Sequence, residues 1–192
     1  MELIKHLERK FGYQVKFLRC DNAGENIKTE EECMKQGLGI TFKYTSPNTP
    51  QQNGRVERKF ATLHGRVRSM MNTALLTGDL RSKLWAECAN TMTKIDNLVD
   101  GKFGKLYGRK AGYATHLHIF GEMCVIAKRE KIQGKLKKKG KLCVFVGYAD
   151  GHVADVFKFY DADTKSIIQS RDVTWLGKSY GEYYTNSPKI VQ

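Results

Sequence analysis

The pattern of apolar and polar positions in the first 45 residues predicts a helix, a strand, a second helix and a second strand. The first helix has apolar side chains at helical spacing: Leu3, Ile4, Leu7 and Phe11. Residues 14–20 favour a strand, residues 29–37 a short helix capped by Thr29, and residues 40–45 a strand with period-two alternation. This succession is typical of a βαβ unit, in which the two strands are parallel.

Two longer helices are predicted to follow. Residues 46–54 hold two of the three prolines and are predicted to be a loop. A helix over about residues 56–76 is indicated by an apolar stripe: Val56, Phe60, Leu63, Val67 and Met70. The next helix, residues 80–99, turns Leu84 and Cys88 inward and uses Trp85 as an apolar anchor.

The second half of the chain reads as a linker followed by short strands. Glycines interrupt residues 100–115, and the strands predicted after them are 123–127, 142–148, 156–160 and 166–173. Strands this short and this close together suggest a small β-barrel. The predicted organisation is an α/β region at 1–99, a linker at 100–115, an all-β barrel at 116–178 and a polar tail at 179–192.

The net charge of the chain predicts a class of binding partner. The 33 Lys and Arg residues outnumber the 20 Asp and Glu residues, which gives a net charge of +13 and favours binding to polyanions such as nucleic acid. The five cysteines contain no C-x-x-C and are expected to be buried thiols, and the pair His116 and His118 is expected to pack or face solvent. No signal peptide or transmembrane segment is recognised, so we expect an intracellular protein without a membrane partner.

Two carboxylates stand out as candidates for chemistry. Asp21 follows the first predicted strand, and Glu57 lies in the first turns of the long helix, with 35 residues between them. At these positions the two side chains can converge on a hard divalent cation. The alternative is that Asp21 caps the turn formed by the next residues, while Glu57 is a solvated acid favoured by the helix dipole. Spacing alone leaves both interpretations open.

Several sequence motifs resemble those of copia-type retrotransposon integrases. The motifs in the first half are L-R-C-D-N-A-G-E-N at 18–26, S-P-N-T-P-Q-Q-N-G-R-V-E-R-K at 46–59 and L-W-A-E-C-A at 84–89. The second half adds L-Y-G-R-K at 106–110, H-L-H-I-F-G-E at 116–122, F-V-G-Y at 145–148 and S-R-D-V at 170–173. The resemblance implies an α/β fold, the RNase H-like integrase core, followed by a small all-β SH3-like barrel.

The same resemblance implies a catalytic role for the two acids. In that family three carboxylates hold two Mg²⁺ (or Mn²⁺) ions for strand transfer, and Asp21 and Glu57 match the second and third as catalytic residues and metal ligands. The first family acid lies on one of three strands that precede the helix at Met1, and this chain contains no match for it. We therefore expect a truncated core, weak or absent metal binding and lost strand transfer. We also expect uncovered apolar surface and marginal stability.

Nucleic-acid contacts are predicted from two groups of basic residues. One group surrounds the predicted active site on the long helix and comprises Arg55, Arg58, Lys59, His64 and Arg68, with Arg66 beside them. The other group surrounds the first hairpin of the barrel and comprises Lys128, Arg129, Lys131, Lys135, Lys137, Lys138, Lys139 and Lys141. Such residues suit DNA backbone contacts with little base readout. For the hairpin group, a solvated linker is the alternative.

Three functions remain open from the sequence. The first is an integrase fragment associated with DNA integration, with a possible homo-oligomer and a nuclear location implied by the family, and without a small-molecule substrate. The second is a non-enzymatic relic that binds nucleic acid. The third is a protein-interaction module whose barrel holds a peptide.

Overall fold

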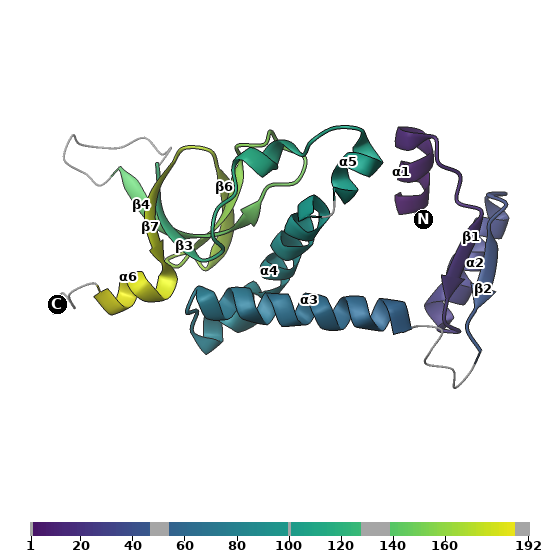
Figure 1. Cartoon of the computed structure of the whole chain (residues 1–192), viewed down its shortest axis with the longest axis horizontal. Coiled ribbons are helices and arrows are strands. Elements are labelled where there is room, and N and C mark those ends of the chain that lie inside the picture. Colours follow the sequence, from purple (N-terminus) through teal and green to yellow (C-terminus); the bar gives the residue numbers. More distant parts are fainter. Residues whose placement is uncertain (1, 47–53, 100, 128–138, 187–192) are drawn as a thin grey trace. The chain divides into compact units, whose positions relative to one another are not determined.

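The computed structural model describes residues 2–46, 54–99, 101–127 and 139–186 of the chain (Figure 1). The chain forms two compact units, Met1–Ala61 and Thr62–Gln192. No described helix is both long enough and apolar enough to cross a membrane.

The first unit contains the predicted βαβ arrangement. Its elements are α1 (Glu2–Phe11), β1 (Phe17–Cys20), α2 (Gly24–Lys35) and β2 (Thr41–Tyr44). The strands β1 and β2 are parallel, with Phe17 opposite Thr41 and Cys20 opposite Tyr44. The predicted start of the second helix was wrong, because α2 begins at Gly24 and Thr29 lies inside it. The Thr29 hydroxyl donates to the Glu25 carbonyl, one turn earlier, at 2.8 Å.

Little apolar surface is buried in this first unit. Among its described residues, only Ile4 and Cys33 are buried apolar side chains. Phe17 on β1 is 61% exposed, and Met34 on α2 is 71% exposed. A sheet of two short strands is marginal in water without a larger apolar face to cover it. The uncovered apolar surface expected from the sequence is therefore present.

The second unit combines helices with a five-stranded sheet. Its elements are α3 (Gly54–Thr73, which begins in the first unit), α4 (Gly78–Val99), α5 (Lys102–Tyr107), η2 (Gly112–Thr115), β3 (Glu122–Ala127), β4 (Gly140–Tyr148), β5 (Phe157–Asp161), β6 (Ser166–Ser170), β7 (Val173–Ser179) and α6 (Tyr180–Asn186). The strand order is β6-β5-β4-β3-β7, and every neighbouring pair is antiparallel.

Strand β4 is buried on both faces, which explains its continuous apolar run. Val144 and Val146 point toward α3 and α4, where they join a core with Val67 and Leu84. The neighbouring positions, Cys143 and Phe145, belong to a second core on the opposite face. Because successive side chains of a strand alternate between faces, one strand supports both cores.

The second core is aromatic and lies inside the curl of the sheet. Phe145, Phe157 and Phe159 come from the central strands, and Trp175 comes from β7 at one end of the strand order. Ile168, from β6 at the other end, packs against the same cluster. Residues from both ends of the sheet meet around one cluster, so the sheet must curl, as the ribbon shows (Figure 1).

Four details differ from the sequence prediction. The segment predicted as a linker forms α5 and η2, and much of the predicted tail forms α6, whose Gly181 amide donates to the Ala74 carbonyl at 3.2 Å. Trp85 is 57% exposed and is not an anchor. The predicted strand 166–173 is broken where the Asp172 amide donates to the Ser170 hydroxyl, so β6 and β7 are separate strands.

Candidate functional site

Asp21 lies at the end of β1 and organises the turn that leads into α2. One of its carboxylate oxygens accepts from the Asn26 side-chain amide at 2.7 Å and from the Ala23 backbone amide at 3.3 Å. This is the local turn bonding that short acidic side chains commonly make. The capping role that the sequence left open for Asp21 is therefore real. The hydrogen bonds of this cap use the same carboxylate that was predicted to bind metal.

Glu57 lies in the first turn of α3, where the helix dipole favours a negative charge. Its side chain is exposed, as are Val56 and Phe60 on either side of it, at 56% and 57%. The apolar stripe predicted along this helix is fully buried only from Val67 onward. More than half of each of these two apolar side chains, Val56 and Phe60, is in contact with solvent, so Glu57 lies on an open helix surface.

The described residues do not fit a two-metal centre. No group of three or more His, Cys, Asp or Glu side chains among them could hold a metal ion. Two separate carboxylates without a third anion provide few of the oxygen ligands that Mg²⁺ requires. The convergence of Asp21 and Glu57 on one cation stays a prediction.

The basic residues predicted on the long helix are all solvent-exposed. Arg55, Arg58 and Lys59 belong to the first unit, and His64 and Arg68 to the second. Arg66 differs from these, because its guanidinium is paired with the Asp96 carboxylate of α4. Exposed cations on successive turns of one helix can contact phosphate groups without reading bases.

The second predicted basic group lies mostly outside the described residues. That part comprises Lys128, Arg129, Lys131, Lys135, Lys137 and Lys138. The strands on either side of it, β3 and β4, pair as far as Ala127 and Gly140, so the group connects two paired strands. Lys139 is exposed. Lys141 already has a structural partner, because it forms an ion pair with the buried Asp161, which raises the pKa of the lysine.

The sequence analysis missed a cavity beside α5. Its walls come from α4, α5 and the connection between β4 and β5, and its volume is about 460 Å³. The residues that form α5 had been assigned to a linker because of their glycines. The spacing of Phe103 and Tyr107 could have revealed this helix, because residues four apart lie on one helical turn and their two rings stack there.

Similarity to known proteins was found along most of the chain. Residues 123–189 match the family model described as the retroviral polymerase SH3-like domain. The chain is 31% identical over 175 residues, 88% of its length, to the retrovirus-related Pol polyprotein from transposon TNT 1-94 of Nicotiana tabacum. It is 28% identical over 74% of its length to the Pol polyproteins from transposons RE2 and RE1 of Arabidopsis thaliana.

The chain belongs to the copia-type retrotransposon Pol polyproteins. It spans only 13% of the Nicotiana relative and 10% of each Arabidopsis relative. The matches confirm the predicted family, and the family model confirms the SH3-like identity of the sheet. The match to the Pol polyproteins includes residues before the SH3-like domain, where the α/β unit lies, because it covers 175 residues.

Several motifs of this Pol segment have structural roles. In F-V-G-Y, Phe145 and Val146 enter opposite cores, and Tyr148 accepts a hydrogen bond from the His118 amide at 3.2 Å. At Gly147 the backbone has φ +141, and an added Cβ would lie 2.4 Å from the Thr91 hydroxyl of α4. This glycine therefore permits the close approach of helix and strand.

The H-L-H-I-F-G-E motif also serves packing. His118 stacks on Trp175 with ring centroids 3.5 Å apart and lies edge-on to Phe157. Gly121 has φ +84, and an added Cβ would lie 2.4 Å from the Cβ of Ala74. Of the two interpretations of the histidine pair, packing is the correct one for His118.

Proposed function

We propose that this Pol segment is an integrase part whose own activity is binding to the nucleic-acid backbone. The parent activity would be Mg²⁺-dependent DNA strand transfer, to which Asp21 and Glu57 would contribute two of the three carboxylates. The D-N-A-G-E and N-G-R-V-E-R motifs around these acids support the integrase assignment.

The observation that carries the proposal is the concentration of positive charge between β3 and β4. Eight of the 14 residues from Lys128 to Lys141 are Lys or Arg, and Glu130 is the only acid among them. The flanking strands β3 and β4 pair as far as Ala127 and Gly140, so this basic sequence joins two neighbouring strands. A concentration of cations in one short segment can neutralise DNA phosphates and release their counterions.

Binding of a DNA duplex at increasing salt tests this proposal. The affinity of the purified chain for duplexes of unrelated sequence should fall steeply with salt and differ little between sequences. Replacing Lys135, Lys137 and Lys138 by Gln should reduce the slope of log K against log salt by about 2.7, since each duplex phosphate contact contributes about 0.9.

A matched control removes the same charge elsewhere. Lys16, Lys28 and Lys35 are exposed in the first unit, and replacing all three by Gln should leave most of the slope intact. If the two triple variants lose equal amounts of the salt slope, the slope depends on net charge alone, and the hairpin assignment is overturned. A chain that binds no DNA even at low salt would overturn the proposal as a whole.

The catalytic side of the proposal has its own test. Among the described residues no third acid joins Asp21 and Glu57 to bridge two dications about 4 Å apart, so the 192-residue chain should not nick or join DNA in Mg²⁺ or Mn²⁺. Metal-dependent cleavage that disappears in Asp21→Asn and Glu57→Gln would show that the two acids suffice and would contradict this expectation.

A further inference from the structure

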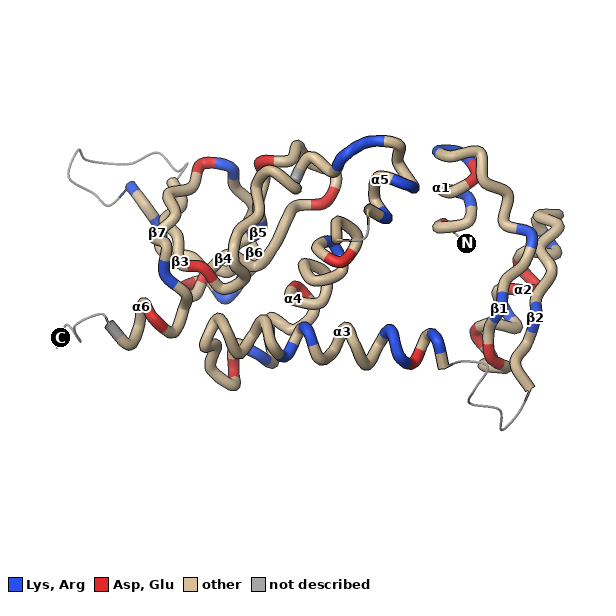
Figure 2. Tube along the Cα trace, viewed as in Figure 1, with Lys and Arg blue, Asp and Glu red and all other residues tan. Residues whose placement is uncertain are grey.

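A third basic surface lies around α5, in residues that the sequence analysis treated as a linker. Between Gly101 and Gly121 the sequence contains four Lys or Arg residues and no Asp or Glu. These four residues, Lys102, Lys105, Arg109 and Lys110, are all exposed. The trace shows basic positions along α5 and directly after it, without acidic positions between them (Figure 2). A surface with this charge is complementary to a polyanion.

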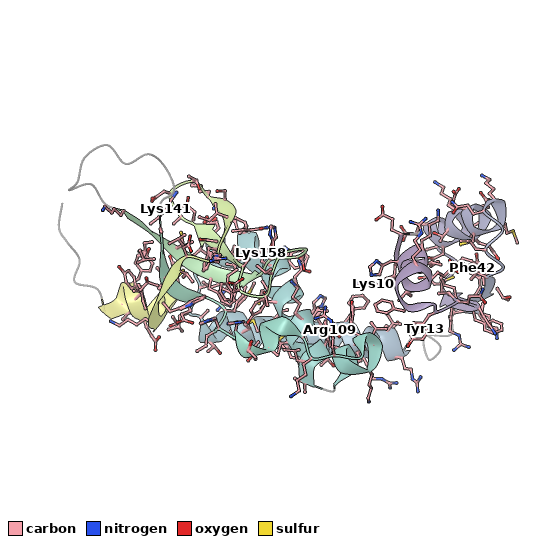
Figure 3. All side chains as sticks on the ribbon, turned by 90° about the horizontal axis from the view of Figure 1, so that it is seen from above. Lys10, Tyr13, Phe42, Arg109, Lys141 and Lys158 are labelled. Atoms are coloured by element: carbon pink, nitrogen blue, oxygen red, sulfur yellow. The ribbon has the colours of Figure 1, made fainter. Side chains whose placement is uncertain are left out.

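Two aromatic rings accompany these cations. Phe103 and Tyr107 stack on one turn of α5, with centroids 4.2 Å apart and an interplanar angle of 16°. The guanidinium carbon of Arg109, the residue labelled in Figure 3, lies 6.0 Å from the centroid of the Phe103 ring, so charge and aromatic surface adjoin. Both rings are half-buried. The helix is held between Gly101 and Gly108, which have φ values of +62 and +64 that favour glycine.

The two rings line the cavity of about 460 Å³ beside α5. Leu106 and Val153 add apolar wall, and Asn97 and His152 add polar groups that can donate or accept hydrogen bonds. Asp150, the acid in the lining, is paired with Lys94 at 2.6 Å and with Lys158 at 3.6 Å. Lys102 also lines the cavity, which therefore presents aromatic and apolar walls beside a basic side chain, at a volume typical of small-ligand sites.

We propose that the α5 site, formed by Phe103, Tyr107, Arg109, Lys110 and this cavity, binds single-stranded nucleic acid. A base enters beside the two rings, and the flanking phosphates contact Arg109 and Lys110. This proposal deepens the proposed function and rests on it. Single strands are favoured over duplexes because only an unstacked base can reach an aromatic surface inside a cavity. A peptide of Asp and Glu residues alone would pair with the cations but has no flat ring to place against the aromatic wall.

Fluorescence anisotropy with labelled oligothymidine and a labelled duplex tests the α5 site in the full chain. Tyr107→Leu keeps apolar bulk but removes the ring, so single-strand affinity should fall on the order of 10-fold while duplex affinity is unchanged. Arg109→Ala with Lys110→Ala should reduce the salt slope for the single strand by about 1.4, since each such phosphate contact contributes about 0.7.

The control is Lys28→Ala with Lys35→Ala, which removes the same charge from exposed positions of α2. If the wild-type chain binds DNA but the α5 variants behave like this control, the α5 site is overturned while the proposed function stands. Equal losses for duplex and single strand in Tyr107→Leu would overturn the single-strand specificity. Competition by polyglutamate as strong as that by unlabelled oligothymidine would assign the site to acidic proteins instead. If the wild-type chain binds neither DNA, both proposals fail.

Discussion

Asp161 shows how a single charged residue is accommodated inside the sheet of the second unit. Its side chain is fully buried at the end of β5, and its carboxylate is paired with Lys141 and accepts from the Thr164 hydroxyl. A third bond comes from the Asp163 amide at 3.0 Å. Burial alone would raise the pKa of Asp161, but these partners outweigh it and lower the pKa below its usual value. The pair joins the start of β4 to the end of β5.

Removing this carboxylate should destabilise the second unit. Asp161→Ala should lower the free energy of unfolding by about 2–3 kcal/mol, because charge-assisted hydrogen bonds are lost inside the protein. Urea denaturation measures this loss, and Asp163→Ala, an exposed neighbour, serves as the control. Because the pKa of Asp161 is lower in the folded state, its contribution should be complete above about pH 4 and disappear as the pH falls further. A deficit that persists unchanged in acid would contradict this account.

Residue roles were only partly predictable from the sequence. The local spacing of Asp21 and the next residues was enough to suggest a capped turn, which the hydrogen bonds bear out. The burial of Asp161 could not be foreseen, because it depends on a lysine 20 positions away across a strand pair. Trp85 was misjudged for the same reason, since a helical position alone does not say which neighbours will cover it.

At the scale of elements, the helices α3 and α4 are inseparable from the SH3-like sheet. Val67 and Met71 of α3 and Leu84 and Cys88 of α4 share one core with Met123, Val144 and Val146 of the sheet. The Thr91 hydroxyl of α4 also donates to the Val146 carbonyl at 3.1 Å. Without the helices, this apolar face of the sheet would be exposed to water.

A shortened chain of residues 116–192 should therefore fail to fold cooperatively. It retains the sheet but lacks the helices that cover Val144 and Val146, so we expect a broad thermal transition and binding of a hydrophobic dye. A chain of residues 62–192 should melt in one sharp transition. In that longer chain, Leu84→Ala should lower the free energy of unfolding by about 2–5 kcal/mol, the usual range for a buried leucine. A sharp transition in the shorter chain would refute the shared core.

Most elements were predictable because their apolar periodicity is strong. The helices α1, α3 and α4 and the strands β3, β4 and β5 lie within a few residues of their predicted positions. The errors fall where tertiary contacts replace local signals, as in α5 and α6. The amide of Tyr180, the first residue of α6, donates to the Gly121 carbonyl at 2.8 Å, a contact that no local pattern reveals.

At the scale of the whole molecule, the two units differ in how they are stabilised. The second unit has two apolar cores on opposite faces of its sheet. The first unit has a two-stranded sheet and two buried apolar side chains among its described residues. The sequence analysis expected this weakness, because the family resemblance implies further strands beside β1, whereas the described residues of the first unit pair only β1 with β2.

Hydrogen exchange should show this difference directly. The backbone amides of β1 and β2 should exchange at rates close to those of unstructured peptide, while those of β4 and β5 should be protected until the second unit unfolds. Mass spectrometry of peptides from the two regions measures both rates in one sample. If the amides of the two sheets are equally protected, the prediction is wrong, and the first unit is as stable against opening as the second.

The two-sided burial of β4 also protects its sheet against misregistered strand pairing, and the β1–β2 sheet lacks this protection. A slip of β4 by one residue would exchange Val144 and Phe145 between two differently shaped cores, so misregistered pairing is penalised on both faces. The partly exposed side chains of β1 and β2 impose no comparable penalty, and among the strands that the structure describes each pairs only with the other. Intermolecular pairing should therefore begin at β1 and β2, which makes the α/β end of the chain the origin of any amyloid-like association.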